Sequence, residues 1–200
     1  MKKQIKTEDI CNEILSLFEK YGDEDYDGEP VSQASHMMQC AMQAINEGAD
    51  TELVLGAFLH DIGHLLRHRQ KTQAMGNYGV VNHEGIGAEY LRANGFSERI
   101  CAVVEKHVDA KRYLVAAQPG YKEKLSFASL QTLEWQGGAM NENEELAFEK
   151  HPFFKDIIRV RLWDEGAKDS NAKTLPLDYF INAINEYLQT QISDTFKTQA

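Results

Sequence analysis

The sequence predicts an all-α fold in a single domain, and three observations support this. Apolar residues recur at helical spacing along most of the chain; Ile10, Ile14 and Leu17 form the first such series, and Gly22 stands just past its end. Strand signals are poor, and the best short candidate, 113–117, is too weak to change the prediction. The length of 200 residues suits one domain, and 42% apolar with 26% charged residues is typical of globular proteins.

The helices can be predicted in order along the chain. The second begins at a serine cap, either Ser32 or Ser35, and ends near Gly48. The third covers 51–67 and is apolar over much of its circumference, which indicates that it is the central helix. The other predicted helices cover 83–94, a segment that begins at the Ser97 cap, 126–135, 144–149, 153–165 and 177–189.

The charge and the apolar runs exclude some functions. The chain has 21 basic and 31 acidic residues, a net charge of -10, whereas proteins that bind duplexes or membrane surfaces need a basic face. We therefore expect no nucleic-acid and no membrane partner. No apolar run approaches the ~20 residues that span a bilayer, and no export signal is visible. The unpaired Cys11, Cys40 and Cys101 indicate reduced thiols in a cytoplasmic protein.

The densest chemistry lies in the sequence His60-Asp61-Ile62-Gly63-His64. On a continuous helix, His60 and His64 project from one face, while Asp61 points about 100° further round. Imidazole and carboxylate together suit iron or zinc. Taken alone, the motif also fits a hydrogen-bonded polar patch on a buried helix.

Three further histidines, His36, His83 and His107, lie at inward positions of three other predicted helices. A buried histidine is costly unless it is hydrogen-bonded or ligates a metal. Asp164 also lies among apolar neighbours, although a position on the helix surface remains open for it. So many inward histidines beside one carboxylate favour a metal centre over separate core histidines.

In order along the chain, these residues resemble the H…HD…D pattern of the HD-domain superfamily. The resemblance implies a compact HD-domain helical bundle over 1–200, with a metal-binding core at about 30–166 and the helix at 177–189 packed on it. Members with additional histidines hold two metals. Carried over, the pattern assigns one metal to His36, His60, Asp61 and Asp164 and the second to His64, His83 and His107, with Asp61 bridging.

Most HD proteins resemble phosphohydrolases, but a smaller branch holds a mixed-valent iron pair and activates dioxygen. This branch contains myo-inositol oxygenase and the organophosphonate-cleaving oxygenases of the PhnZ type. The chain resembles the PhnZ type along nearly its whole length. The matching segments are 26–33, 60–64, 76–79, 83–88, 107–114 and parts of 125–138. The resemblance implies two irons, Fe(II)/Fe(III), with dioxygen and an aminohydroxyphosphonate as substrates.

The implied reaction cleaves the C–P bond of 2-amino-1-hydroxyethylphosphonate to give glycine and phosphate. A trimethylammonio analogue that gives glycine betaine is a close alternative. The resemblance places Tyr26 at an iron position until substrate displaces it. It places Glu29 near the amino end of the substrate. With Lys111, these residues form the predicted catalytic set. His64 is also a predicted substrate contact.

Lys111 lies one turn after His107, so its ammonium group could bind a phosphonate oxygen. Ser129 and Thr132, three residues apart, could donate hydroxyls to the same oxygens, although both also suit a helix surface. Arg161 is either a partner of Asp164 or part of a surface salt bridge. The rival functions are a metal-dependent phosphohydrolase acting on a nucleotide or phosphate monoester, and a catalytically silent HD module. Oligomeric state stays open.

Overall fold

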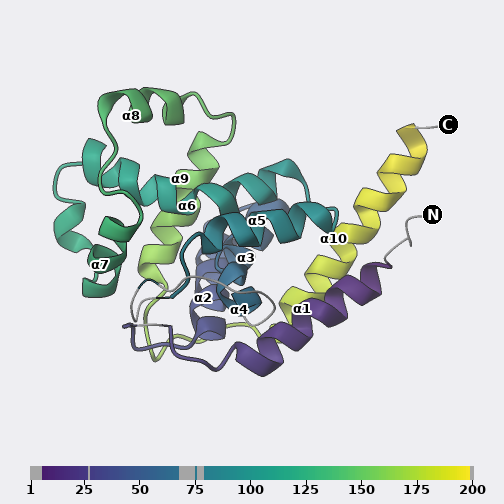
Figure 1. Cartoon of the computed structure of the whole chain (residues 1–200). Helices are drawn as coiled ribbons and strands as arrows, with labels where there is room; N and C mark the ends of the chain where they lie inside the picture. Colours follow the sequence, from purple (N-terminus) through teal and green to yellow (C-terminus); the bar gives the residue numbers. More distant parts are fainter. Residues whose placement is uncertain (1–5, 27, 68–74, 76–78, 199–200) are drawn as a thin grey trace.

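The computed structural model describes residues 6–26, 28–67, 75 and 79–198, with side chains described as far as residue 192. All regular elements in these ranges are helices, so the all-α prediction is confirmed there (Figure 1). The elements are α1 (Thr7–Tyr21), α2 (Gln33–Asn46), α3 (Thr51–Leu59), α4 (Ile62–Leu66), α5 (His83–Ala93), α6 (Glu98–Ala117), the short 3-10 helix η2 (Lys122–Lys124), α7 (Phe127–Trp135), α8 (Glu142–Glu149), α9 (Phe154–Gly166) and α10 (Leu177–Thr198).

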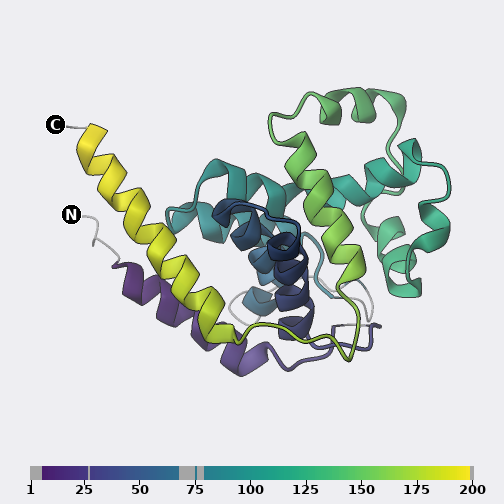
Figure 2. The same ribbon diagram turned by 180° about the vertical axis from the view of Figure 1, so that it is seen from behind.

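The two ends of the chain form one side of the molecule. Helices α1 and α10 lie side by side in both views, away from α7 and α8 (Figures 1 and 2). Three stacked rings join them to the core: the Phe58 ring lies 4.9 Å from that of Phe18 and 4.7 Å from that of Phe180. Buried aromatic rings contribute large apolar areas, so this stack fixes the terminal helices to α3.

The central position predicted for the third helix is confirmed for its first part. The side chains of residues 53–59 in α3 are all buried, and α2, α6, α9 and α10 pack around them. The prediction of one helix over 51–67 is wrong, because the helix breaks after Leu59 and restarts as α4 at Ile62. Asp61 in the break has φ -106° and ψ 14°. His60 and His64 therefore do not share the face of one helix. The turn lets the adjacent His60 and Asp61 face the same interior, where a continuous helix would separate them by about 100°.

Serine side chains start several helices as expected. Ser32, Ser97 and Ser126 accept hydrogen bonds from backbone amides of α2, α6 and α7. The strand candidate 113–117 lies in the last turns of α6, and the predicted helix at 177–189 continues to Thr198. Among the described residues, no helix has both the length and the apolar character needed to cross a bilayer. All three cysteines are free and buried.

Gly63 lets α4 approach the start of α5 closely. A Cβ atom at Gly63 would lie 1.9 Å from the backbone oxygen of His83. We expect Gly63→Ala to lower the free energy of unfolding by about 3 kcal/mol, because backbone atoms on both sides must move apart. Denaturant unfolding checks this value.

Gly85→Ala is the matched control, because the three atoms nearest to a Cβ atom at Gly85 belong to the side chain of Asn82, which can move. We expect this variant to stay within about 1 kcal/mol of the parent protein. Equal destabilisation by the two substitutions would contradict the close-approach argument.

Candidate metal centre

Six buried side chains from separate parts of the chain converge between the helices. α2, α6 and α9 contribute one residue each, α5 contributes its first residue, and the break between α3 and α4 contributes two. Each of the six is at most 4% exposed. They form two groups of three: His36, His60 and Asp164, and Asp61, His83 and His107.

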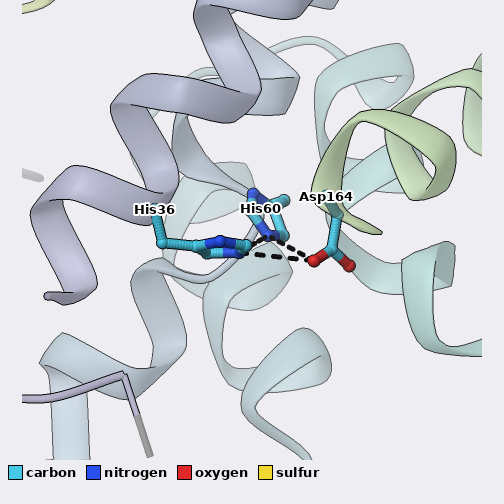
Figure 3. Close-up of side chains that lie close together, drawn as sticks. All are labelled: His36, His60 and Asp164. Carbon is cyan, nitrogen blue, oxygen red and sulfur yellow. Dashed lines mark hydrogen bonds and ion pairs between the residues drawn. The ribbon is translucent and has the colours of Figure 1, made fainter. Parts of the chain in front are cut away.

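The first group joins α2, the end of α3 and α9 (Figure 3). The Nε2 atoms of His36 and His60 lie 3.1 Å apart. The Oδ1 atom of Asp164 lies 3.3 Å from His36 Nε2 and 3.9 Å from His60 Nε2. Two imidazole nitrogens and one carboxylate oxygen thus face a common point.

The second group repeats this arrangement with Asp61 as its carboxylate. The Nε2 atoms of His83 and His107 lie 3.2 Å apart, and Asp61 Oδ1 lies 3.2 and 3.4 Å from them. The other oxygen, Oδ2, lies 3.3 Å from His60 Nε2 and 3.5 Å from His36 Nε2. Asp61 therefore directs one oxygen to each group, which is the geometry of a bridging ligand.

Backbone carbonyl groups fix the orientation of all four rings in the two groups. The Nδ1 atoms lie 2.7–3.1 Å from carbonyl oxygens that accept their protons: Ala167 for His36, Ala57 for His60, Val80 for His83 and Val104 for His107. In the neutral ring each Nε2 atom is then left with a free lone pair, which is the usual arrangement of metal-binding histidine.

The electrostatics of the two groups also fit metal ions. In each group the two Nε2 atoms face each other at hydrogen-bond distance, an arrangement that a cation between them would stabilise. Burial lowers the pKa of His60 and of His83, but Asp61 outweighs it and raises both, so the site favours positive charge. Oδ1 of Asp61 and Oδ1 of Asp164 are buried without a hydrogen-bond partner among the described residues. Burial alone would raise the pKa of Asp61, but His60 and the other histidines hold it well below its ordinary value, so the carboxylate stays ionised. The donor set therefore fits two metal ions.

His64 lies beside the second group but differs from its members. Its ring stacks on that of His83, with centroids 4.0 Å apart, and its Nε2 atom lies 3.9 Å from Asp61 Oδ1. Its Nδ1 atom accepts a hydrogen bond of 3.4 Å from the backbone N–H of Val80. In the neutral ring Nε2 then carries the proton, which suits a hydrogen-bond donor to substrate better than a metal ligand.

Tyr26 lies against the first group, and a turn places it together with Glu29. The ring of Tyr26 stacks on that of His36, with centroids 3.9 Å apart. The backbone N–H of Glu29 donates to the carbonyl oxygen of Tyr26 over 2.8 Å, and Gly28 has φ 84°, a value that favours glycine. Burial and the charges of Asp61 and Asp164 raise the pKa of Tyr26 well above its usual value, so the phenol stays neutral.

A pocket adjoins both groups and contains the remaining predicted residues. It is small, with a cavity volume of about 50 Å³, and is lined by residues that include Tyr26, Glu29, His64, Lys111, Ser129 and Thr132. The ammonium group of Lys111 donates to Thr132 Oγ1 over 2.9 Å and to the Ser129 carbonyl over 3.4 Å. The hydroxyl of Thr132 in turn lies within 3.2 Å of the carbonyl oxygens of Ala128 and Ser129, so its proton is engaged within α7.

Arg161 is a partner of the metal centre and does not form a surface salt bridge. It is 4% exposed, and its guanidinium donates to Asp164 Oδ2 over 2.5 Å and to Tyr121 Oη over 3.0 Å. The spacing of three residues from Asp164 was the signal for this contact. Sequence reasoning missed Lys168, which contacts Glu29 and Ser129, and no short motif marks it. His68 and the segment 76–78 lie outside the described residues.

The protonation of Lys111 predicts a pH dependence. Burial lowers the pKa of its ammonium group to about 7, and Arg161 acts in the same direction. Because the cation is present below this pKa and lost above it, we expect kcat/KM for an anionic substrate to fall as the pH rises through about 7. Steady-state rates from pH 6 to 9 test this. In Lys111→Arg, which stays cationic, the same fall in kcat/KM would contradict the assignment to Lys111.

The chain is similar to several known proteins. Residues 33–147 match the HD domain family. A 1-hydroxy-2-(trimethylamino)ethylphosphonate dioxygenase (glycine-betaine-forming) of Leisingera caerulea is 42% identical over 82% of this chain and 83% of its own length. A hydroxymethylphosphonate dioxygenase of Gimesia maris is 34% identical, with 88% and 87% covered. An uncharacterised protein of Acanthamoeba polyphaga mimivirus is 42% identical, with 88% and 81% covered.

The chain therefore belongs to the HD-domain family and, within it, to the group of oxygenases that includes these phosphonate dioxygenases. It is an enzyme of this oxygenase group, and its two clusters of histidine and aspartate could hold the metal ions that such an enzyme binds.

Proposed function

We propose that this enzyme is a di-iron oxygenase that cleaves the C–P bond of a 1-hydroxyethylphosphonate with a cationic substituent at C2. With a primary amino group the products are glycine and phosphate; with a trimethylammonio group they are glycine betaine and phosphate. The relative from Leisingera caerulea, named for the trimethylamino compound, supports a substrate of this class. Both atoms of one O2 molecule enter the products, so the atoms balance without another reactant.

The observation that carries the proposal is the joining of the two ligand groups by the two oxygens of Asp61, beside a pocket that contains a buried lysine. When bound, an Fe(II)/Fe(III) pair supplies activation of dioxygen and the redox chemistry. His36, His60, Asp61 and Asp164 would hold one iron, and Asp61, His83 and His107 the other.

The protein's own residues bind and orient the substrate. In the cationic form, Lys111 would attract a phosphonate oxygen, and its hydrogen bonds to α7 fix the direction of the ammonium group. Ser129 lines the same pocket and offers a hydroxyl donor. We assign His64 a hydrogen bond to substrate through its protonated Nε2, consistent with its acceptor role at Nδ1. Glu29 would face the cationic substituent. Tyr26, a neutral phenol against His36, would yield its place when substrate enters.

One experiment separates this function from its rival, hydrolysis of a nucleotide or phosphate monoester. The protein is loaded anaerobically with iron, partly oxidised and examined by EPR with and without the aminohydroxyphosphonate. Oxygen is then admitted and released phosphate is measured. We expect a mixed-valent signal that changes with substrate, and phosphate release only with oxygen. Phosphate release from nucleotides without oxygen would instead establish a hydrolase. The absence of both the signal and oxygen-dependent release would refute the oxygenase.

A further inference from the structure

Lys168 joins three segments at the edge of the pocket. It follows the end of α9 by two residues, and its side chain is 13% exposed. Its Nζ atom lies 3.0–3.2 Å from four oxygen atoms: Glu29 Oε1, Ser126 Oγ, Ser129 Oγ and Glu165 Oε1. One ammonium group thus links the loop before α2, the first turn of α7 and the end of α9.

These contacts determine the directions of the hydroxyl protons of the two neighbouring serines. Ser126 donates its hydroxyl to Glu29 Oε1, so this oxygen accepts from both Ser126 and Lys168. Ser129 Oγ accepts from Lys168, which leaves the hydroxyl proton of Ser129 free to donate into the pocket that it lines. In this respect Ser129 differs from Thr132, whose proton is engaged by α7.

Lys168 also supplies the charge that balances Glu29. The Glu29 side chain is 8% exposed, and a carboxylate so buried needs a counter-ion. In the described parts of the chain, Lys168 is the cation that pairs with it. The nearby guanidinium of Arg161 is already bound to Asp164 and Glu165, and Lys111 donates to α7.

We propose that Lys168 is a positioning residue that sets substrate specificity through Glu29: it is the resident counter-ion of this carboxylate and determines the charge that Glu29 presents to the substrate. The inference rests on the proposed function, because it takes Glu29 to face the substituent of a phosphonate. With Lys168 in place, the Glu29 end of the pocket is balanced and accepts phosphonates with or without a cationic substituent. Without it, the unbalanced carboxylate repels the phosphonate group unless the substrate brings its own cation.

The substitution Lys168→Met removes the charge and keeps most of the side-chain volume. We expect the Kd of hydroxymethylphosphonate, which has no cationic substituent, to rise about tenfold, because a buried carboxylate is left without its partner. The Kd of 2-amino-1-hydroxyethylphosphonate should change less than about threefold, since its ammonium group replaces that of Lys168 beside Glu29. The trimethylammonio analogue should follow the amine, because the effect depends on charge. Anaerobic calorimetry of the iron-loaded full chain measures each Kd without turnover.

Two further variants make the result specific. Lys168→Arg keeps the cation, and its two Kd values should stay close to those of the parent protein. In a Glu29→Gln background, Lys168→Met should leave the ratio of the two Kd values unchanged, because the Glu29 carboxylate is absent and Glu165 keeps Arg161 as its cation. A ratio that still shifts in this background would overturn the proposal, as would equal weakening of both ligands by Lys168→Met, which a purely structural lysine would cause.

The outcomes also separate this proposal from the proposed function. If the Kd values follow the expected pattern but oxygen releases no phosphate, the oxygenase reaction fails and the role of Lys168 stands. If neither ligand binds the parent protein, the role of Lys168 is overturned. If Lys168→Met does not fold, as judged by its thermal transition, Lys168→Gln replaces it in the same comparison.

Discussion

Replacing Asp61 with Asn is expected to abolish oxygenase activity, with a loss of at least about 1,000-fold in kcat, because the two ligand groups share this carboxylate. Its two oxygens lie within 3.5 Å of four imidazole nitrogens, one pair in each group. Asn keeps the shape of the side chain but removes its charge and provides one oxygen in place of two. We expect the purified variant to hold fewer than two metal ions per chain by elemental analysis, and to lack a mixed-valent EPR signal.

Asp156→Asn is the control for this experiment. Asp156 is a carboxylate of α9 that pairs with Arg99 over 2.8 Å and does not belong to either ligand group. This variant should keep the metal content and activity of the parent protein. If Asp61→Asn still binds two metals and keeps its EPR signal, Asp61 is not the bridge between the two groups.

Replacing Lys111 with Met is expected to lower kcat/KM for the phosphonate about 100-fold while leaving the metal content unchanged. Loss of one partner of a buried charge pair typically costs 2–5 kcal/mol, and a factor of 100 corresponds to about 2.7 kcal/mol. Lys111 is 3% exposed and lies one turn after His107, yet it belongs to neither ligand group. We therefore expect the loss mainly as a higher KM, with the EPR signal of the substrate-free protein retained.

Lys106→Met is the matched control, since Lys106 lies on the same helix and pairs with Asp109 near the surface. Its removal should change kcat/KM by less than about twofold, as is usual for a surface ion pair. Loss of iron from Lys111→Met would mean that Lys111 stabilises the metal centre. Unchanged turnover would refute its role in binding.

The sequence by itself determined the all-α class, and its histidine and aspartate residues predicted a candidate metal centre. Apolar spacing marked the helices, because a helix that packs on a core must repeat its apolar residues at its own period. The same rule predicted a third helix that was too long. Periodicity could not reveal the break at His60 and Asp61, because both halves remain apolar and the turn contains neither proline nor glycine.

Only the tertiary structure decided how these residues act. Asp61 could be placed between two groups of ligands only once α2, α5, α6 and α9 were packed around the break. One hydrogen bond distinguishes His64 from the other four histidines of the site: its Nδ1 atom accepts from the backbone N–H of Val80. No sequence spacing predicts this contact. Lys168 meets Glu29 across 139 positions of the chain, as a contact between a loop and the end of a helix. Local spacing specifies which face a side chain takes on its own helix, whereas counter-ions, bridging oxygens and proton directions depend on which helices meet.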